Sequence, residues 1–169
     1  MVDNSADAVA ACILPVVRTQ VLYSQLDVRN VALDASFFTF ATSVAQFEAQ
    51  SLAIGWRGLN ERTFAFHRLC SLLWEQVTQL TVTHTGYTSI SLCEDKAIES
   101  VVVRDNTALA SLVVPRPVTQ LSAANCPRLS ALSLPHAEVL DLSFTNVTDT
   151  RQLCSTWGSR VLVYRGVRG

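Results

Sequence analysis

The sequence predicts an α/β solenoid, in which the chain winds into right-handed coils and each coil adds one strand to a parallel sheet of about seven strands. Seven short apolar-x-apolar motifs recur along the chain, and their first members are 26, 28, 21, 20, 19 and 21 residues apart. Alternating apolar positions indicate strands that bury one face, and a repeat of this length is typical of stacked coils. The motifs are Leu26/Val28, Leu52/Ile54, Leu80/Val82, Val101/Val103, Leu121/Ala123, Leu140/Leu142 and Val161/Val163.

Length and composition indicate one domain spanning 1–169. A chain of 169 residues, 49% of them hydrophobic, is long enough to bury a core without disulfides or metals. Charged residues make up only 16%, against about 25% in ordinary domains, so the surface is expected to be apolar enough to favour a partner. We divide the domain into an N-terminal cap at 1–20, helix-containing repeats at 21–76, short repeats at 77–150, and a C-terminal cap and tail at 151–169.

The first two intervals between motifs are the longest, so these coils have room for a helix on the convex side. In 34–50 the apolar residues follow a helical spacing, with Asp34 or Ser36 available as the N-cap. They are Phe37, Phe40, Ala41, Val44 and Phe47. The second helix is expected after Asn60, with Phe66, Leu69, Cys70 and Leu73 on one face.

The later coils are too short for helices, and their second halves have the pattern of short strands or extended segments. These segments are 89–92, 112–115 and 132–135. Two of them belong to an internal copy, because aligning 106–115 with 126–135 superposes leucines on leucines and the two prolines on each other. We therefore expect a second strand per coil on the convex side of the C-terminal half.

The segment from Leu140 to Asp149, LDLSFTNVTD, resembles the Leu-x-Leu-x-x-Asn/Cys-x-Leu signature of leucine-rich repeats. In that family a polar residue three positions after the second apolar residue bonds to backbone inside the turn. The corresponding residues here are Thr85, Asn106, Cys126 and Thr145, whereas the first two coils have Val31 and Arg57 instead. Such bonds are needed because a chain that turns in a buried corner must satisfy its backbone polar groups.

A second repeat class leaves an alternative for the short coils. The run from Leu129 to Pro135 is also similar to the Leu-x-x-Leu-x-Leu-Pro text of Treponema-type repeats, in which the convex strands of our prediction would line the concave face. We favour the first register because Leu140 follows Leu132 by only 8 residues.

The residues that could carry catalysis or bind a cofactor do not form a recognisable site. His67 and Cys70 are the one close pair of base and nucleophile, but a contact three residues apart on a helix is commonplace. His84 follows a strand, and His136 follows Pro135 in a corner. The five cysteines lie far apart and their number is odd, so we expect reduced thiols. We expect no enzyme activity, no cofactor and no metal.

Charge and hydropathy set expectations for location and partners. The net charge is −1 with no basic run, so we expect neither nucleic acid nor a membrane as partner. The apolar stretch 8–17 follows an acidic N-terminus and is too short to span a bilayer. We expect an intracellular, cytoplasmic protein that binds a protein partner or a larger assembly.

The outward residues of the strands are the predicted binding surface, because extended concave sheets are what solenoids offer to partners. Most are small or uncharged, and the flanking Arg, Trp and Tyr are usual interface anchors. The predicted residues are Arg29, Trp56, Thr81, Thr83, Arg104, Asp141, Ser143 and Tyr164. This makes the chain an interaction module or adaptor. The alternatives are a self-associating scaffold, which includes a homo-oligomer, and a hydrolase with a corner site near His84 and Asp105.

Overall fold

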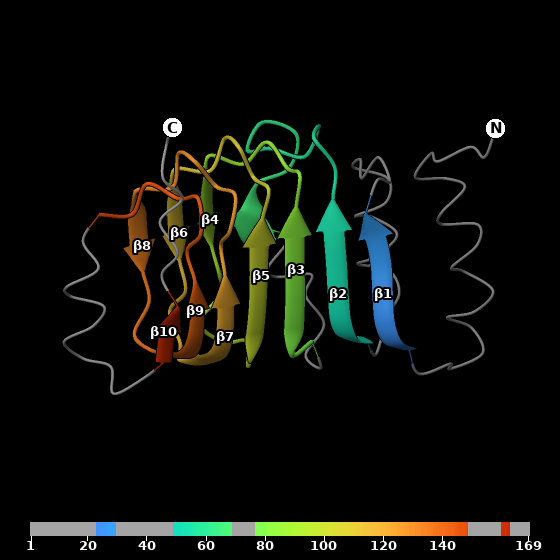
Figure 1. Cartoon of the computed structure of the whole chain (residues 1–169). Helices are drawn as coiled ribbons and strands as arrows, with labels where there is room; N and C mark the ends of the chain where they lie inside the picture. Colours follow the sequence, from blue (N-terminus) through green and yellow to red (C-terminus); the bar gives the residue numbers. More distant parts are fainter. Residues whose placement is uncertain (1–22, 30–48, 69–76, 149–159, 163–169) are drawn as a thin grey trace, which may run out of the picture.

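A computed structural model describes residues 23–29, 49–68, 77–148 and 160–162 (Figure 1). In this part of the chain the regular structure consists almost entirely of strands, which form two parallel sheets. None of its helical residues belongs to a helix that is long and apolar enough to cross a membrane.

The larger sheet has seven strands, and all its pairings are parallel. In sheet order they are β1 (Tyr23–Arg29), β2 (Ala49–Gly55), β3 (Gln79–Thr83), β5 (Ser100–Arg104), β7 (Val118–Ser122), β9 (Ala137–Asp141) and β10 (Arg160–Leu162). The first apolar residue of each motif lies opposite that of the next: Leu26, Leu52, Leu80, Val101, Leu121, Leu140 and Val161. The seven predicted strands and their register are therefore confirmed.

The smaller sheet consists of the short strands predicted for the later coils. They are β4 (Ser89–Ser91), β6 (Ser111–Val113) and β8 (Ala131–Ser133), paired in parallel with Leu112 opposite Leu132. From β3 to β9 the chain alternates between the two sheets, and Figure 1 shows the small sheet behind the C-terminal half of the large one.

The hydrophobic core contains the inward residues of both sheets. Leu80, Val101 and Leu121 of the large sheet are fully buried, and so are Ile90 and Leu112 of the small one. They belong to one apolar cluster. Along β3 and β5, alternation thus buries the two apolar residues of each motif, as the apolar-x-apolar pattern predicts.

Each turn after β3, β5, β7 and β9 contains a residue in the left-handed region. These are His84, Asp105, Asn125 and Phe144, with φ between 53° and 58°. His, Asp and Asn tolerate this conformation better than most residues do, whereas a bulky Phe is strained in it. The four turns therefore share one backbone geometry although their side chains differ.

The residue after each left-handed position bonds inside the corner, as predicted. Asn106 Nδ2 donates to the Val82 carbonyl at 2.8 Å and to the Arg104 carbonyl at 3.0 Å, while Asn106 Oδ1 accepts from the backbone N–H and hydroxyl of Thr85. Cys126 Sγ donates to the Val103 carbonyl at 3.2 Å. The Thr145 hydroxyl donates to the Leu142 carbonyl at 2.8 Å. These side chains replace bonds that the turning backbone cannot make with itself.

Little of the two predicted helices falls in the described part. The helix predicted in 34–50 lies outside it, apart from the last residues, which belong to β2. Asn60 Oδ1 accepts from the Arg62 and Thr63 N–H groups, as an N-cap residue would. The residues that follow form a turn, however, and the described helical residues are 66–68. The prediction that a helix begins directly after Asn60 was wrong, because Thr63 also closes a turn onto Gly58 there.

Cys126 has a buried thiol, which we expect to be unreactive. Burial raises the pKa of its thiol to about 11, a nearby hydrogen bond from the Asn106 backbone opposes this increase, and Asp105 adds to it. Because the thiolate is the nucleophile, native protein treated with iodoacetamide at about pH 8 should leave Cys126 unmodified, while the partly exposed Cys93 reacts. Peptide mass spectrometry reads both sites, and equal labelling of the two in native protein would contradict the described burial.

Candidate functional site: a charged depression on the large sheet

The outward face of the large sheet carries the side chains that alternate with the core residues. Strand pairing brings them into rows across the sheet, one of which runs through Asp27, Ala53, Thr81, Val102, Ser122 and Asp141. In the next row toward the strand ends, Thr83 lies opposite Arg104, and Arg29 lies opposite Gly55. Residues that are far apart in sequence thus lie side by side on one surface.

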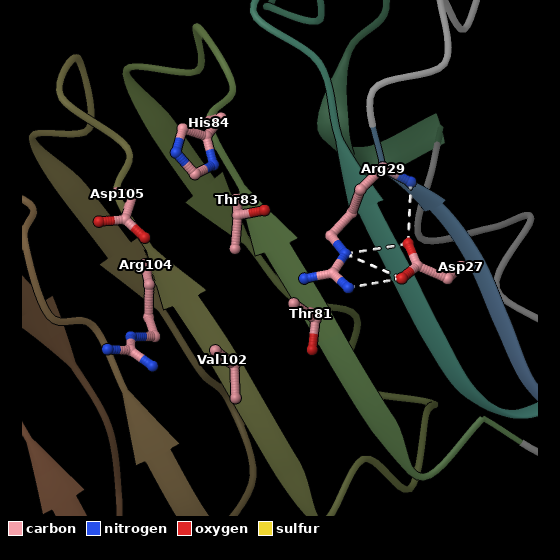
Figure 2. Close-up of a pocket in the computed structure, with 8 residues that line it drawn as sticks. All are labelled: Asp27, Arg29, Thr81, Thr83, His84, Val102, Arg104 and Asp105. Carbon is pink, nitrogen blue, oxygen red and sulfur yellow. Dashed lines mark hydrogen bonds and ion pairs between the residues drawn. The ribbon is translucent and has the colours of Figure 1, made fainter.

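A depression of about 580 Å³ lies on this face, over the C-terminal ends of β1, β3 and β5. Figure 2 shows its lining side chains, which come from β1 on one side and from β3, β5 and their following turns on the other. The lining residues are Asp27, Arg29, Thr81, Thr83, His84, Val102, Arg104 and Asp105. Four of them, Arg29, Thr81, Thr83 and Arg104, belong to the predicted binding surface.

Gly55 of β2 allows Arg29 and Thr83 to approach each other across the sheet. A Cβ at this position would lie 2.7 Å from the Thr83 carbonyl oxygen and 2.8 Å from its hydroxyl oxygen, and 3.3 Å from Arg29 Cγ. Because one of these close contacts is to backbone, a larger residue would displace β3. The alkyl part of Arg29 therefore lies over β2, and its guanidinium points toward β3 (Figure 2).

Arg29 is held in place by Asp27. Its Nε lies 2.9 Å and 3.0 Å from the two carboxylate oxygens, and the carboxylate also accepts from the Arg29 backbone N–H. The hydrogen bond from the Arg29 side chain lowers the pKa of Asp27, and the same contact raises the pKa of Arg29. Both groups stay charged, so one wall of the depression is a salt bridge with little net charge.

Asp141 and Ser143 form a second polar cluster on β9 and its following residues. The Asp141 carboxylate accepts from the Ser143 N–H at 3.0 Å, from the Ser143 hydroxyl at 2.6 Å and from the Ser122 hydroxyl at 3.0 Å. Partial burial raises the pKa of Asp141, but these hydrogen bonds and the charge of Arg104 outweigh it and lower the pKa below its ordinary value of 3.8. Arg104 thus connects the depression electrostatically to this cluster.

The lowered pKa of Asp141 predicts a loss of stability in acid. Because the folded pKa lies below the unfolded one, the stabilisation is fully present above the ordinary value of 3.8 and is lost as pH falls through the lower folded pKa. The difference in free energy of unfolding between wild type and Asp141→Asn should therefore be constant near neutral pH and shrink below about pH 4. Urea unfolding across this range measures it, and a difference independent of pH would contradict the prediction.

His84 and Asp105 also line the depression, which brings together the two residues of the hydrolase alternative. They form no hydrogen bond with each other, and Asp105 instead accepts from Asn125 Nδ2 at 3.0 Å. Across the described ranges no three His, Cys, Asp or Glu side chains converge as a metal site would require. The depression therefore offers guanidinium and hydroxyl donors together with carboxylate acceptors, an arrangement suited to binding.

Three predicted binding residues in the described part of the chain do not line the depression: Asp141 and Ser143, which form the second cluster, and Trp56. Trp56 follows β2, is half-buried and packs against the hydrophobic core, and a Cβ on Gly58 would lie within 3 Å of its indole ring. Tyr164 lies outside the described residues. The predicted set in turn omitted Asp27, Val102, His84 and Asp105. The strand pattern points Asp27 and Val102 outward, but only the left-handed turn geometry brings the last two to this face.

Comparison of the chain with protein-family models, with curated proteins and with solved structures finds no match.

Proposed function

We propose that the chain is a non-catalytic protein-interaction module, an adaptor or assembly subunit that binds its partner across the outward face of the large sheet. The observation that carries this proposal is the depression, which charged and hydroxyl side chains from three strands line on the outward face of the large sheet. Two of the lining side chains are arginines, which are frequent interface anchors.

We further propose that the coils form a right-handed, leucine-rich-repeat-like solenoid. Three features support this: the constant register of the apolar motifs, the alternation of the chain between two parallel sheets, and the side chains that bond within each corner. Solenoids use such a continuous sheet as an extended binding surface. The inference to function depends on the surface residues, because fold alone does not determine function.

Affinity capture from native cell extract tests the proposal. The bait is wild-type chain or a double variant, Arg29→Ala with Arg104→Ala, and the control bait carries Arg116→Ala with Arg128→Ala, two exposed arginines that do not line the depression. All three should have the same melting temperature. A captured protein is then purified, and its affinity for each variant is measured by calorimetry.

We expect a partner that binds wild type and the control equally, and that binds the depression variant at least about tenfold more weakly, since hot-spot arginines contribute this much or more. Equal affinity for all three baits would contradict an interface at the depression. A product released from a broad panel of hydrolase substrates, and lost on His84→Ala, would contradict the non-catalytic assignment.

A further inference from the structure

We propose that the depression recognises a carboxylate side chain on an acidic segment of the partner protein, with Arg104 and Arg29 as the hydrogen-bond donors. This inference rests on the proposed function and adds the chemistry of the partner.

Arg104 is the cationic group available to a ligand. The residue is exposed, and its guanidinium makes no hydrogen bond or ion pair with any residue that the structure describes, although its charge acts on Asp141. A guanidinium has five N–H donors in a planar arrangement that matches a carboxylate. Its donors are therefore unused within the described part of the chain, and the residue lines the depression.

Arg29 supplies a second donor that is already oriented. Its bonds to Asp27 use Nε and one terminal nitrogen, while Figure 2 shows the other terminal nitrogen turned away from Asp27 and toward β3. The salt bridge and the close packing over Gly55 restrict the side chain before any ligand arrives. Binding thus loses less side-chain entropy than it would with a mobile arginine.

The surface between the two arginines adds hydroxyl donors. Thr81 and Thr83 lie on β3, between β1 and β5, and both line the depression. Neither hydroxyl makes a side-chain hydrogen bond within the described part of the chain. A carboxylate placed over β3 can therefore accept from a threonine and from a guanidinium at once.

Charge balance favours a carboxylate over a phosphate. Asp27 and Asp105 line the same depression as the two arginines, so a dianionic phosphate would meet two carboxylates as well as two guanidiniums. A singly charged carboxylate needs only one guanidinium to balance its charge, and its two oxygens fit the planar donors of Arg104. The depression lies on the outward face of the sheet, so an acidic segment of the partner can lie across the strands there.

A peptide titration tests the proposal. The probe is a ten-residue peptide of alternating Glu and Gly, labelled for fluorescence anisotropy, and the matched control has Gln in place of Glu. Each is titrated into wild type, Arg104→Ala, Arg104→Lys and Arg128→Ala at low and high salt. Amide and arginine Nε chemical shifts of isotope-labelled wild type locate the site.

We expect the Glu peptide to bind wild type and Arg128→Ala equally, and Arg104→Ala about tenfold more weakly. Arg104→Lys should be intermediate because lysine keeps the charge without the planar donor pair. The shifts should concentrate at Arg29, Thr83 and Arg104, and added salt should weaken binding.

Three results would overturn the proposal: the Gln peptide binding as tightly as the Glu peptide, Arg104→Ala binding as tightly as Arg128→Ala, or no binding at all. Acetate or inorganic phosphate that displaces the peptide at equal concentration would instead assign the site to a small anion. If the captured partner is lost from the depression variant while the Glu peptide fails to bind, the interaction surface stands and only carboxylate recognition is rejected.

Discussion

Asn106→Ala is expected to lower the free energy of unfolding by about 3–5 kcal/mol, the largest effect that we predict for a polar residue of this chain. Asn106 is fully buried at the corner between β5 and the turn that leads to β6. Its side chain makes four hydrogen bonds, two as donor and two as acceptor.

The effect is large because each bond has a partner that alanine would leave unsatisfied. The carbonyls of Val82 and Arg104 and the N–H of Thr85 would lose an acceptor or donor in a place where water has little access. Each such buried group costs about 1–3 kcal/mol, and relaxation of the corner recovers part of the sum. The bond to Val82 also joins the turn after β5 to β3, so its loss affects more than the local turn.

Urea unfolding of three variants measures this effect. Asn106→Cys should lose less than Asn106→Ala, because Cys126 at the equivalent position of the next coil donates to backbone through its thiol. Asn146→Ala is the control, since Asn146 is exposed and its side chain makes no hydrogen bond in the described residues; it should change stability by less than about 0.5 kcal/mol. A loss at Asn106 no greater than at Asn146 would mean that the corner bonds do not stabilise the fold.

The two sheets could be predicted from the sequence because strands that bury one face carry the apolar-x-apolar motif. Leu80 and Val101, or Leu112 and Leu132, occupy equivalent positions since each must pack into the same core, and strand pairing follows that alignment. The turn after Asn60 was predicted less well. There side-chain bonds from Thr63 to Gly58 compete with helix formation, and such a local preference is not visible in apolar spacing.

Only some of the residues that line the depression follow from the strand pattern. Alternation shows that Thr81 and Arg104 point outward, but not that Gly55 lets Arg29 extend over β2. Likewise His84 and Asp105 lie in the turns after β3 and β5, where a left-handed φ, which strand alternation does not indicate, accompanies their place in the lining. The alternation of residues along the strands therefore identifies the outward face of the large sheet, whereas backbone geometry and close contacts determine which residues of that face lie together.

Leu112→Ala is expected to lower the free energy of unfolding by about 3–5 kcal/mol, and Leu132→Ala by only about 1–2 kcal/mol. The two leucines are direct partners in the small sheet. Leu112 belongs to the central strand β6 and is fully buried, whereas Leu132 belongs to the edge strand β8 and is only partly buried. The substitution removes the same atoms at both positions, so any difference in the loss of unfolding free energy reflects how completely neighbouring residues cover each side chain.

The double variant, Leu112→Ala with Leu132→Ala, measures the coupling between β6 and β8. Because the leucines are opposite each other on adjacent strands, their combined loss should differ from the sum of the single losses by about 0.5 kcal/mol or more. Denaturant unfolding of the wild type, the two single variants and the double variant gives both quantities. Equal single losses that simply add would mean that the two leucines contribute to stability independently. Unequal and coupled losses would show that the packing of β6 depends on β8 beside it.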